Sequence, residues 1–319
     1  MRLAVVSAVA VAAALIGGVV ALALGSASGL TDGVTTTVVI DRSASPPTTG
    51  GGPTPIRPLR AGTFDPAAIY AHRASGVVTL YADFGPDGLS QGSGFVVDGQ
   101  GTILTNAHVV TNVASLPDGA SAADVRGADE LIVVFRDGDR VPARIVGWDL
   151  FSDVGVVDVD PAERAVEPVP LGNSDDVVVG APVAAIGSPF NEQSSLSVGV
   201  VSAVDRSIAS LTSVYNVAGA IQVDAPINKG NSGGPLFDAA GRVIGINAQI
   251  RSSSGTAEGV GFAIPINIAR RALAQLQRSG RVRYAYIGIT TQDVTPGLAR
   301  RFGFEARRGA LVSQVEPGT

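Results

Sequence analysis

Residues 222–237 read Gln-Val-Asp-Ala-Pro-Ile-Asn-Lys-Gly-Asn-Ser-Gly-Gly-Pro-Leu-Phe, and the rest of the chain is organised around them. An apolar, strand-like approach ends in a turn rich in glycine and asparagine, and Ser232 lies on that turn. Glycines at 230, 233 and 234 let the backbone turn tightly and adopt positive φ angles, which residues with a Cβ avoid. Such a loop can aim the backbone N–H groups of Gly230 and Ser232 at one point, as an oxyanion hole requires. The alternative is a turn with an ordinary exposed serine, because a hydroxyl is a weak nucleophile without a base.

The search for a base is short, because the chain has only two histidines. His108 lies in Thr-Asn-Ala-His-Val-Val, residues 105–110, at the end of a β-rich run. His72 lies in a short helical pattern, and we interpret it as a structural residue. The acid that would orient the base has four neighbouring candidates, namely Asp149, Asp153, Asp158 and Asp160.

Three short blocks together carry a family resemblance. They are Thr-Asn-Ala-His-Val-Val (105–110), Ser-Asp-Val-Gly-Val-Val (152–157) and Gly-Asn-Ser-Gly-Gly-Pro-Leu (230–236). In this order they resemble the three catalytic blocks of the HtrA (Deg) family of serine proteases. The resemblance implies that His108 is the general base and Ser232 the nucleophile. The order His, Asp, Ser is that of chymotrypsin-like enzymes and differs from the orders in subtilisins and α/β-hydrolases.

The acid is assigned by alignment to the same family. Asp153 opens the run Asp-Val-Gly-Val-Val, where the family usually shows Asp-Leu-Ala-Val-Leu. Gly155 departs from the usual alanine, which leaves the assignment of Asp153 intact. Asp149 is the fallback, and the other two aspartates are interpreted as solvated loop charges. The acid is expected to fix the tautomer of the imidazole and to stabilise the imidazolium.

Composition limits the class of protein. The 319 residues, 45% of them hydrophobic, suffice for about two domains with a sizeable core. A net charge of −5 without a basic block gives no support for nucleic-acid binding. The absence of cysteine excludes thiol nucleophiles, disulfides and thiolate metal sites. Because the two histidines are far apart in sequence, we expect no zinc site and no cofactor.

Forty glycines, nineteen prolines and many runs of β-branched residues predict short strands joined by tight turns. The fold class predicted for residues 63–266 is all-β, with two six-stranded antiparallel barrels of chymotrypsin-like type. Closed antiparallel barrels explain regular short strands without helices between them. The runs expected for the first barrel are 76–81, 92–97, 102–105, 131–135, 141–147 and 154–159. Those expected for the second are 182–187, 195–202, 220–223, 235–238, 243–250 and 259–264.

The first 25 residues are interpreted as a signal anchor. Residues 3–24 carry no charge, and a helix of that length spans roughly 33 Å, enough to cross a bilayer. Positive charge precedes this stretch and Asp32 follows it, so the rest of the chain is expected outside the cytoplasm. Secretion after cleavage near Ala21-Leu-Ala is the alternative. Residues 26–62, rich in proline, glycine and threonine, are expected to form an extended linker.

Two polar loops, 188–195 and 248–258, are expected near the site. The resemblance implies that the second forms one wall of the pocket for the residue before the cleaved bond. We place Ile227, Ile250 and Val260 in that pocket, with ordinary barrel core as the alternative for each. Because all three are apolar, a small or medium aliphatic side chain should fit best.

After the barrels, residues 267–282 predict a linker helix, capped by Asn267 and ended by Gly280. Residues 283–319 resemble the opening of a PDZ domain. In such domains a peptide C-terminus is held on backbone N–H groups, and the resemblance assigns that loop to Ile287, Gly288 and Ile289. The helix that should line the peptide groove is missing, so we expect an incomplete PDZ domain.

The resemblance implies a membrane-anchored serine endopeptidase of the cell envelope that degrades unfolded or misfolded polypeptides. A chaperone-like or latent family member that binds unfolded protein is the alternative function, and an esterase on the same triad is a further one. The family commonly forms trimers through residues near the start of the protease domain. Phe64 and Tyr70 are the candidates for such contacts here, with core packing as the alternative.

Overall fold

The computed structural model describes seven segments of the chain, which are residues 64–117, 120–188, 194–213, 215–228, 230–250, 260–307 and 309–316. The chain divides into two units, 1–54 and 55–319, and every described residue belongs to the second. The expected signal anchor (1–25) and the expected linker (26–62) lie outside the described residues. Within the described segments, every helix is too short or too polar to cross a bilayer.

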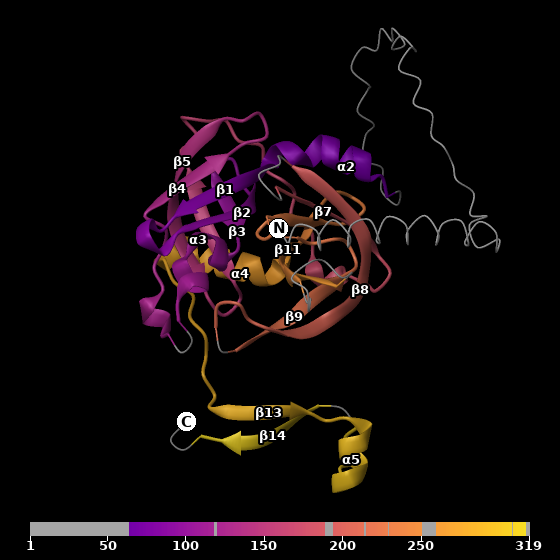
Figure 1. The fold of residues 1–319 in the computed structure, drawn as a ribbon. Helices are drawn as coiled ribbons and strands as arrows, with labels where there is room; N and C mark the ends of the chain where they lie inside the picture. Colours follow the sequence, from indigo (N-terminus) through magenta and orange to yellow (C-terminus); the bar gives the residue numbers. More distant parts are fainter. Residues whose placement is uncertain are drawn as a thin grey trace, which may run out of the picture. The chain divides into compact units, whose positions relative to one another are not determined.

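The first barrel forms from six antiparallel strands that close on themselves (Figure 1). Their spatial order is β1-β2-β3-β6-β5-β4, and pairing of β1 with β4 completes the ring. Apolar side chains alternate inward along the strands, as Val78 and Leu80 do on β1, and fill the interior. The strands are β1 (Val77–Asp83), β2 (Leu89–Val96), β3 (Thr102–Thr105), β4 (Glu130–Val134), β5 (Arg140–Asp149) and β6 (Val154–Val159).

The second barrel also closes, in the order β10-β11-β12-β9-β8-β7, with β10 paired to β7. Its strands are β7 (Pro182–Gly187), β8 (Ser195–Ala209), β9 (Asn216–Val223), β10 (Pro235–Phe237), β11 (Val243–Ile250) and β12 (Gly261–Pro265). The expectation of an all-β fold built on closed six-stranded barrels is confirmed. The expected end of β8 at residue 202 was wrong, because the strand continues to Ala209 through several register shifts against β9.

Helices begin and end where local chemistry allows. Asp65 accepts a hydrogen bond from the Ala68 amide and caps α2 (Pro66–Arg73), and Gly280, with φ of 67°, ends α4 (Ile266–Ser279). The prediction that Asn267 caps α4 was wrong. Pro265 occupies that position, and the Asn267 side chain instead donates to Asn173. Short 3₁₀ turns occupy Ala74–Gly76, Gly85–Asp87, Asn112–Ser115, Ala122–Asp124 and Ser174–Asp176.

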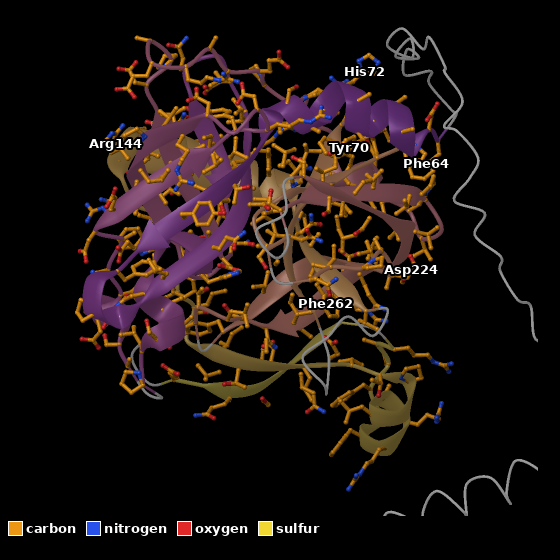
Figure 2. The ribbon with its side chains drawn as sticks, turned by 45° about the horizontal axis from the view of Figure 1, so that its top comes forward. Phe64, Tyr70, His72, Arg144, Asp224 and Phe262 are labelled. Carbon is orange, nitrogen blue, oxygen red and sulfur yellow. The ribbon has the colours of Figure 1, made fainter. Side chains whose placement is uncertain are left out.

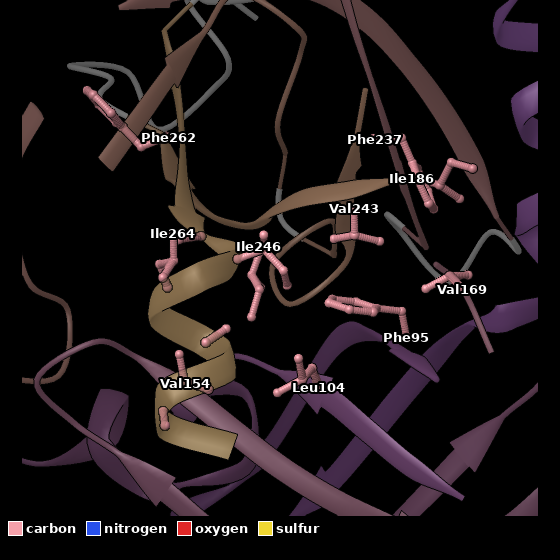
Figure 3. Packing of buried hydrophobic residues seen from close by; sticks show 14 of the residues in the cluster. Phe95, Leu104, Val154, Val169, Ile186, Phe237, Val243, Ile246, Phe262 and Ile264 are labelled. Carbon is pink, nitrogen blue, oxygen red and sulfur yellow. The ribbon is translucent and has the colours of Figure 1, made fainter. Parts of the chain in front are cut away.

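Besides the apolar interior of each barrel, a further apolar cluster lies between the barrels and packs them against each other (Figure 3). The first barrel supplies Phe95, Leu104 and Val154, and the second supplies Ile186, Phe237 and Ile246 among others. The buried face of α4, formed by Ile266, Ala269, Ala272 and Leu276, belongs to the same cluster. Because burial of each large aliphatic side chain contributes about 1.5–3 kcal/mol, this cluster fixes one barrel against the other.

The part of the described chain that follows α4 contains a small unit with its own sheet. It contains β13 (Ile289–Asp293), α5 (Pro296–Phe302) and β14 (Ala310–Val315), and the two strands pair antiparallel. Thr295 caps α5 through its side chain. Ile287 and Ile289, assigned to the peptide-binding loop, are exposed, and the Gly288 carbonyl accepts a hydrogen bond from the Glu316 amide.

Gly233, on the Ser232 loop, lies very close to the first barrel. Its φ is +84°, and a Cβ there would lie 2.1 Å from the Ser93 carbonyl oxygen and 2.3 Å from Thr105 Oγ1. Gly219 also has positive φ, +75°, but among the described residues no atom other than those of its chain neighbours lies within 4 Å of its Cβ position. Substitutions at the two glycines therefore separate the destabilisation caused by backbone strain from that caused by steric overlap.

We predict that Gly233→Ala lowers the free energy of unfolding much more than Gly219→Ala does. In both variants an alanine at positive φ destabilises the folded state by roughly 1–2 kcal/mol. Only Gly233→Ala also forces the barrels apart. Thermal unfolding followed by circular dichroism measures both, with about 2–4 °C expected per kcal/mol in a domain of this size. Equal losses in the two variants would contradict the close approach at Gly233.

Candidate active site

The loop that carries Ser232 has the tight geometry that its glycines predict. The Asn231 amide donates to the Asn228 carbonyl (3.0 Å), which closes a four-residue turn with Gly230 in third position at φ +99°. A positive φ is unfavourable for residues with a Cβ and therefore favours glycine at this position. Gly233 also has positive φ. Gly234 does not, and a Cβ there would instead collide with the Ile186 carbonyl oxygen at 2.4 Å.

His108 lies on a single helical turn, α3 (Ala107–Val110), directly after β3. Its Nδ1 is 2.7 Å from Asp153 Oδ2, and its backbone N–H donates to Asp153 Oδ1 (3.0 Å). Burial by itself lowers the pKa of His108, but the negative charge of Asp153 and its hydrogen bond together outweigh burial and raise that pKa above 6.5. The imidazole is therefore oriented through Nδ1, which leaves Nε2 for proton transfer.

Asp153 is held in place from several directions. It is buried, and its φ of 53° is rare for a residue with a Cβ. Its carbonyl accepts hydrogen bonds from the Ala107 amide (3.2 Å) and from Asn106 Nδ2 (2.8 Å). With the two contacts to His108, four hydrogen bonds join Asp153 to α3 and to Asn106, the residue that precedes this helix. A strained backbone conformation persists only when its surroundings fix it in this way.

Asp149, the fallback for the acid, has different partners. Its carboxylate accepts hydrogen bonds from the Phe151 amide and from the hydroxyls of Ser152 and Tyr284. The alternative that Asp149 orients His108 is therefore wrong. The match to the family block had favoured Asp153, and the structure places the Asp153 carboxylate beside His108.

Ser232, like His108, lies at the interface between the two barrels. Its carbonyl accepts a hydrogen bond from the Ser93 amide (2.8 Å), and neighbouring Gly92 packs against both Val109 and the Ser232 carbonyl. The Ser232 hydroxyl donates to the Ala248 carbonyl (3.0 Å). A hydroxyl has a single proton to donate, so in this state the proton is directed to Ala248 and not to His108.

Ser93 is a site residue that the motif search missed. It is fully buried on β2, its hydroxyl donates to the Gly230 carbonyl (2.6 Å), and it accepts from the Ser188 amide (2.9 Å). Its own carbonyl accepts from Thr105 Oγ1 (2.7 Å). Ser93 thus joins the Ser232 loop to the strand that leads to His108. The signal was the Gly-Ser-Gly run at 92–94, because glycines within a strand mark close backbone approach.

The remaining predicted residues lie elsewhere. Ile227 is buried in the interior of the second barrel, and Val260 is partly buried against the cluster between the barrels. The side chain of Ile250 lies outside the described part of the chain, so the pocket assignment stays a prediction.

His72 is exposed on α2, near Phe64 and Tyr70 (Figure 2). Tyr70 and Phe64 pack against the cluster between the barrels, and the Tyr70 hydroxyl donates to the Ser194 carbonyl (2.7 Å).

Two closed barrels, with a His–Asp pair on one and a glycine-rich serine loop from the other, define the chymotrypsin-like class of serine hydrolases. The family model for a trypsin-like peptidase domain matches residues 92–246. The HtrA-type protease AlgW, solved with a tripeptide, superposes with a TM-score of 0.66 at 34% identity, over 80% of this chain and 77% of that one. The chain therefore belongs to the HtrA family of serine proteases.

Curated relatives agree with this family. A probable periplasmic serine endoprotease, DegP-like, from Pseudomonas fluorescens is 41% identical over 227 residues, 71% of this chain and 43% of the relative. One with the same description from Halomonas elongata is 42% identical over 228 residues, 72% of this chain and 44% of the relative. The chain spans less than half of the length of these curated relatives.

We predict that the His108 imidazole titrates above 6.5 and that Asp153→Asn lowers its pKa. Burial remains in that variant, while the charge that stabilises the imidazolium is gone. Proton NMR of the imidazole signals measures this, and His72→Gln assigns the two resonances. An unchanged His108 pKa in Asp153→Asn would contradict the pairing.

The same raised pKa has a consequence for stability. Protonated His108 stabilises the folded state, and this contribution is fully present below about pH 6.5, the unfolded value. It is lost as the pH rises through the folded pKa of His108.

Proposed function

We propose that this protein is an HtrA-like serine endopeptidase that hydrolyses peptide bonds of unfolded or damaged proteins. The observation that carries the proposal is the His108–Asp153 pair, which two hydrogen bonds join. Asn106 and Ala107 hold the Asp153 carbonyl, and Ser93 fixes the Ser232 loop at the same interface between the barrels. Family membership supports the reaction class. The names of the relatives support an endoprotease.

In the proposed first step, Ser232 Oγ turns from the Ala248 carbonyl toward His108 Nε2 by rotation about its Cα–Cβ bond. His108 takes the hydroxyl proton as Oγ attacks the scissile carbonyl carbon, and the carbonyl π electrons move to oxygen. Asp153 holds Nδ1–H and stabilises the imidazolium. The C–N bond then breaks and His108 gives the proton to the leaving amine. Water hydrolyses the acyl-enzyme by the same steps, with His108 again as base.

The oxyanion is proposed to be bound by the backbone N–H groups of Gly230 and Ser232. Two features support this role. Gly230 has a positive φ, which permits the tight turn of this loop, and the Ser93 hydroxyl fixes the Gly230 carbonyl. Donors fixed before the reaction stabilise the developing charge without a reorganisation cost, and losing one such donor costs about 10²–10³ in kcat.

The pocket proposed for the residue before the cleaved bond is lined by Ile227, Ile250 and Val260. We predict that peptides with alanine or valine at this position are cleaved at least about 100-fold faster, in kcat/KM, than those with lysine or aspartate. An apolar pocket cannot pair a charge, and burying an unpaired charge is costly. A matched series of fluorogenic peptides measures the preference, and faster cleavage after a charged residue would contradict this lining.

The function is tested with purified protein and an unfolded substrate such as reduced casein. We predict that Ser232→Ala abolishes cleavage and fluorophosphonate labelling, and that Asp153→Asn lowers kcat by about 10⁴. Ser279→Ala, at the exposed end of α4, is the matched control and should behave as wild type. Substrate loss that is equal in wild type and Ser232→Ala would favour the chaperone-like alternative and remove the case for this nucleophile.

The setting of the enzyme is part of the proposal. An extracytoplasmic catalytic domain, held by residues 3–24, is supported by relatives described as periplasmic and by the charge pattern of that stretch. Residues 283–319 are proposed to be the start of a PDZ domain, with Ile287, Gly288 and Ile289 as its peptide-binding loop. A homotrimer through Phe64 and Tyr70 remains a prediction. Both side chains pack against the cluster between the barrels, which favours the alternative of core packing.

A further inference from the structure

The turn that leads into Asp153 is tied to the segment that follows α4. Asp149, at the end of β5, is buried, and its carboxylate accepts the Tyr284 hydroxyl together with Ser152 Oγ. The Phe151 amide donates to the other carboxylate oxygen (3.2 Å). The Tyr284 ring also packs against Phe151, with 5.0 Å between ring centroids. Tyr284 therefore contacts the turn through both its hydroxyl and its ring.

A second tie holds the same turn from the other barrel. Thr212, buried in the loop between β8 and β9, donates its hydroxyl to the Leu150 carbonyl. Tyr215, from the same region, places its ring 5.4 Å from that of Phe151. Residues 150–152 are therefore held by two segments that do not belong to the first barrel. They connect directly to Asp153, whose positive φ requires a fixed turn.

The Tyr284 hydroxyl is a constant donor in this network. Burial, the hydrogen bond to Asp149 and the charge of Asp149 raise its pKa far above 10, while Ser152 and Arg271 of α4 oppose the shift more weakly. The phenol therefore keeps its proton across the physiological pH range. A buried carboxylate needs such donors, because an unpaired oxygen would retain its full desolvation cost.

We infer that Tyr284 is a positioning residue for the proposed reaction: through Asp149 it holds the turn that presents Asp153 to His108. This inference rests on the proposed peptidase function, but it assigns a role to a residue outside the protease barrels. The segment after α4 then contributes to the geometry of the active site, although it provides no group to the substrate.

The test compares Tyr284→Phe with Tyr286→Phe in the full chain. The first variant removes the donor to Asp149 and keeps the ring on Phe151. The second removes a neighbouring hydroxyl whose partner is Glu316, and it serves as the matched control. We expect Tyr284→Phe to lower kcat about ten-fold with KM unchanged, in keeping with loss of one hydrogen bond to a charged group. Tyr286→Phe should keep wild-type kcat.

Two readouts separate positioning from a general loss of stability. The His108 imidazole pKa, followed by NMR, should fall in Tyr284→Phe because Asp153 is held less firmly, and the acid limb of kcat/KM should move with it. In a double-mutant cycle with Asp149→Asn, the second substitution should add little to the first. Wild-type kcat and an unchanged His108 titration in Tyr284→Phe would overturn the inference.

The NMR titration needs no substrate turnover, so it decides the role of Tyr284 independently of the proposed function. A His108 pKa that falls in Tyr284→Phe supports the positioning role even in a protein without peptidase activity. Failure of the proposed function has a different signature, namely casein loss that is equal in wild type and Ser232→Ala.

Discussion

The close approach of the two barrels around the buried Ser93 is the constraint on which the rest depends. One side chain and its backbone join β2 to the Ser232 loop, to the start of the Ser188 loop and to the end of β3. Such short links are possible only because Gly92 and Gly233 carry no Cβ at the contact. The apolar cluster between the barrels supplies the free energy that holds them together, and these polar links fix their register.

A strained acid is the second consequence of this arrangement. Asp153 adopts a positive φ, which is strained for a residue with a Cβ. Four hydrogen bonds to α3 and to Asn106 hold it there, and the Thr212 hydroxyl holds the turn before it. The Asp153 carboxylate held in this way raises the pKa of His108 despite the burial of the imidazole. The Ser232 hydroxyl is directed to the Ala248 carbonyl, and the proposed reaction requires it to turn toward His108.

Much of this could be predicted from the sequence, for identifiable reasons. Alternating apolar residues and punctuating glycines located the strands, because that pattern follows from the pleat of a half-buried strand. Motif resemblance found His108 and Ser232. Asn267 misled the capping prediction, since any helix-start asparagine fits the pattern while Pro265 takes the position. The length of β8 was missed because its register shifts break the alternation.

By itself, the sequence determined the elements and the chemical groups: strand periods, positive-φ glycines and the three reactive side chains are local properties of the chain. The family motif favoured Asp153 as the acid, but only the folded chain shows that Asp153 and not Asp149 contacts His108, that Ser93 links the barrels, and that Tyr284 reaches Asp149. Each of these depends on contacts between residues far apart in sequence, and neither residue type nor spacing specifies such distances. Asp149 and Asp153 are the same residue type four positions apart, and the folded chain gives one the Tyr284 hydroxyl and the other the His108 imidazole as partner.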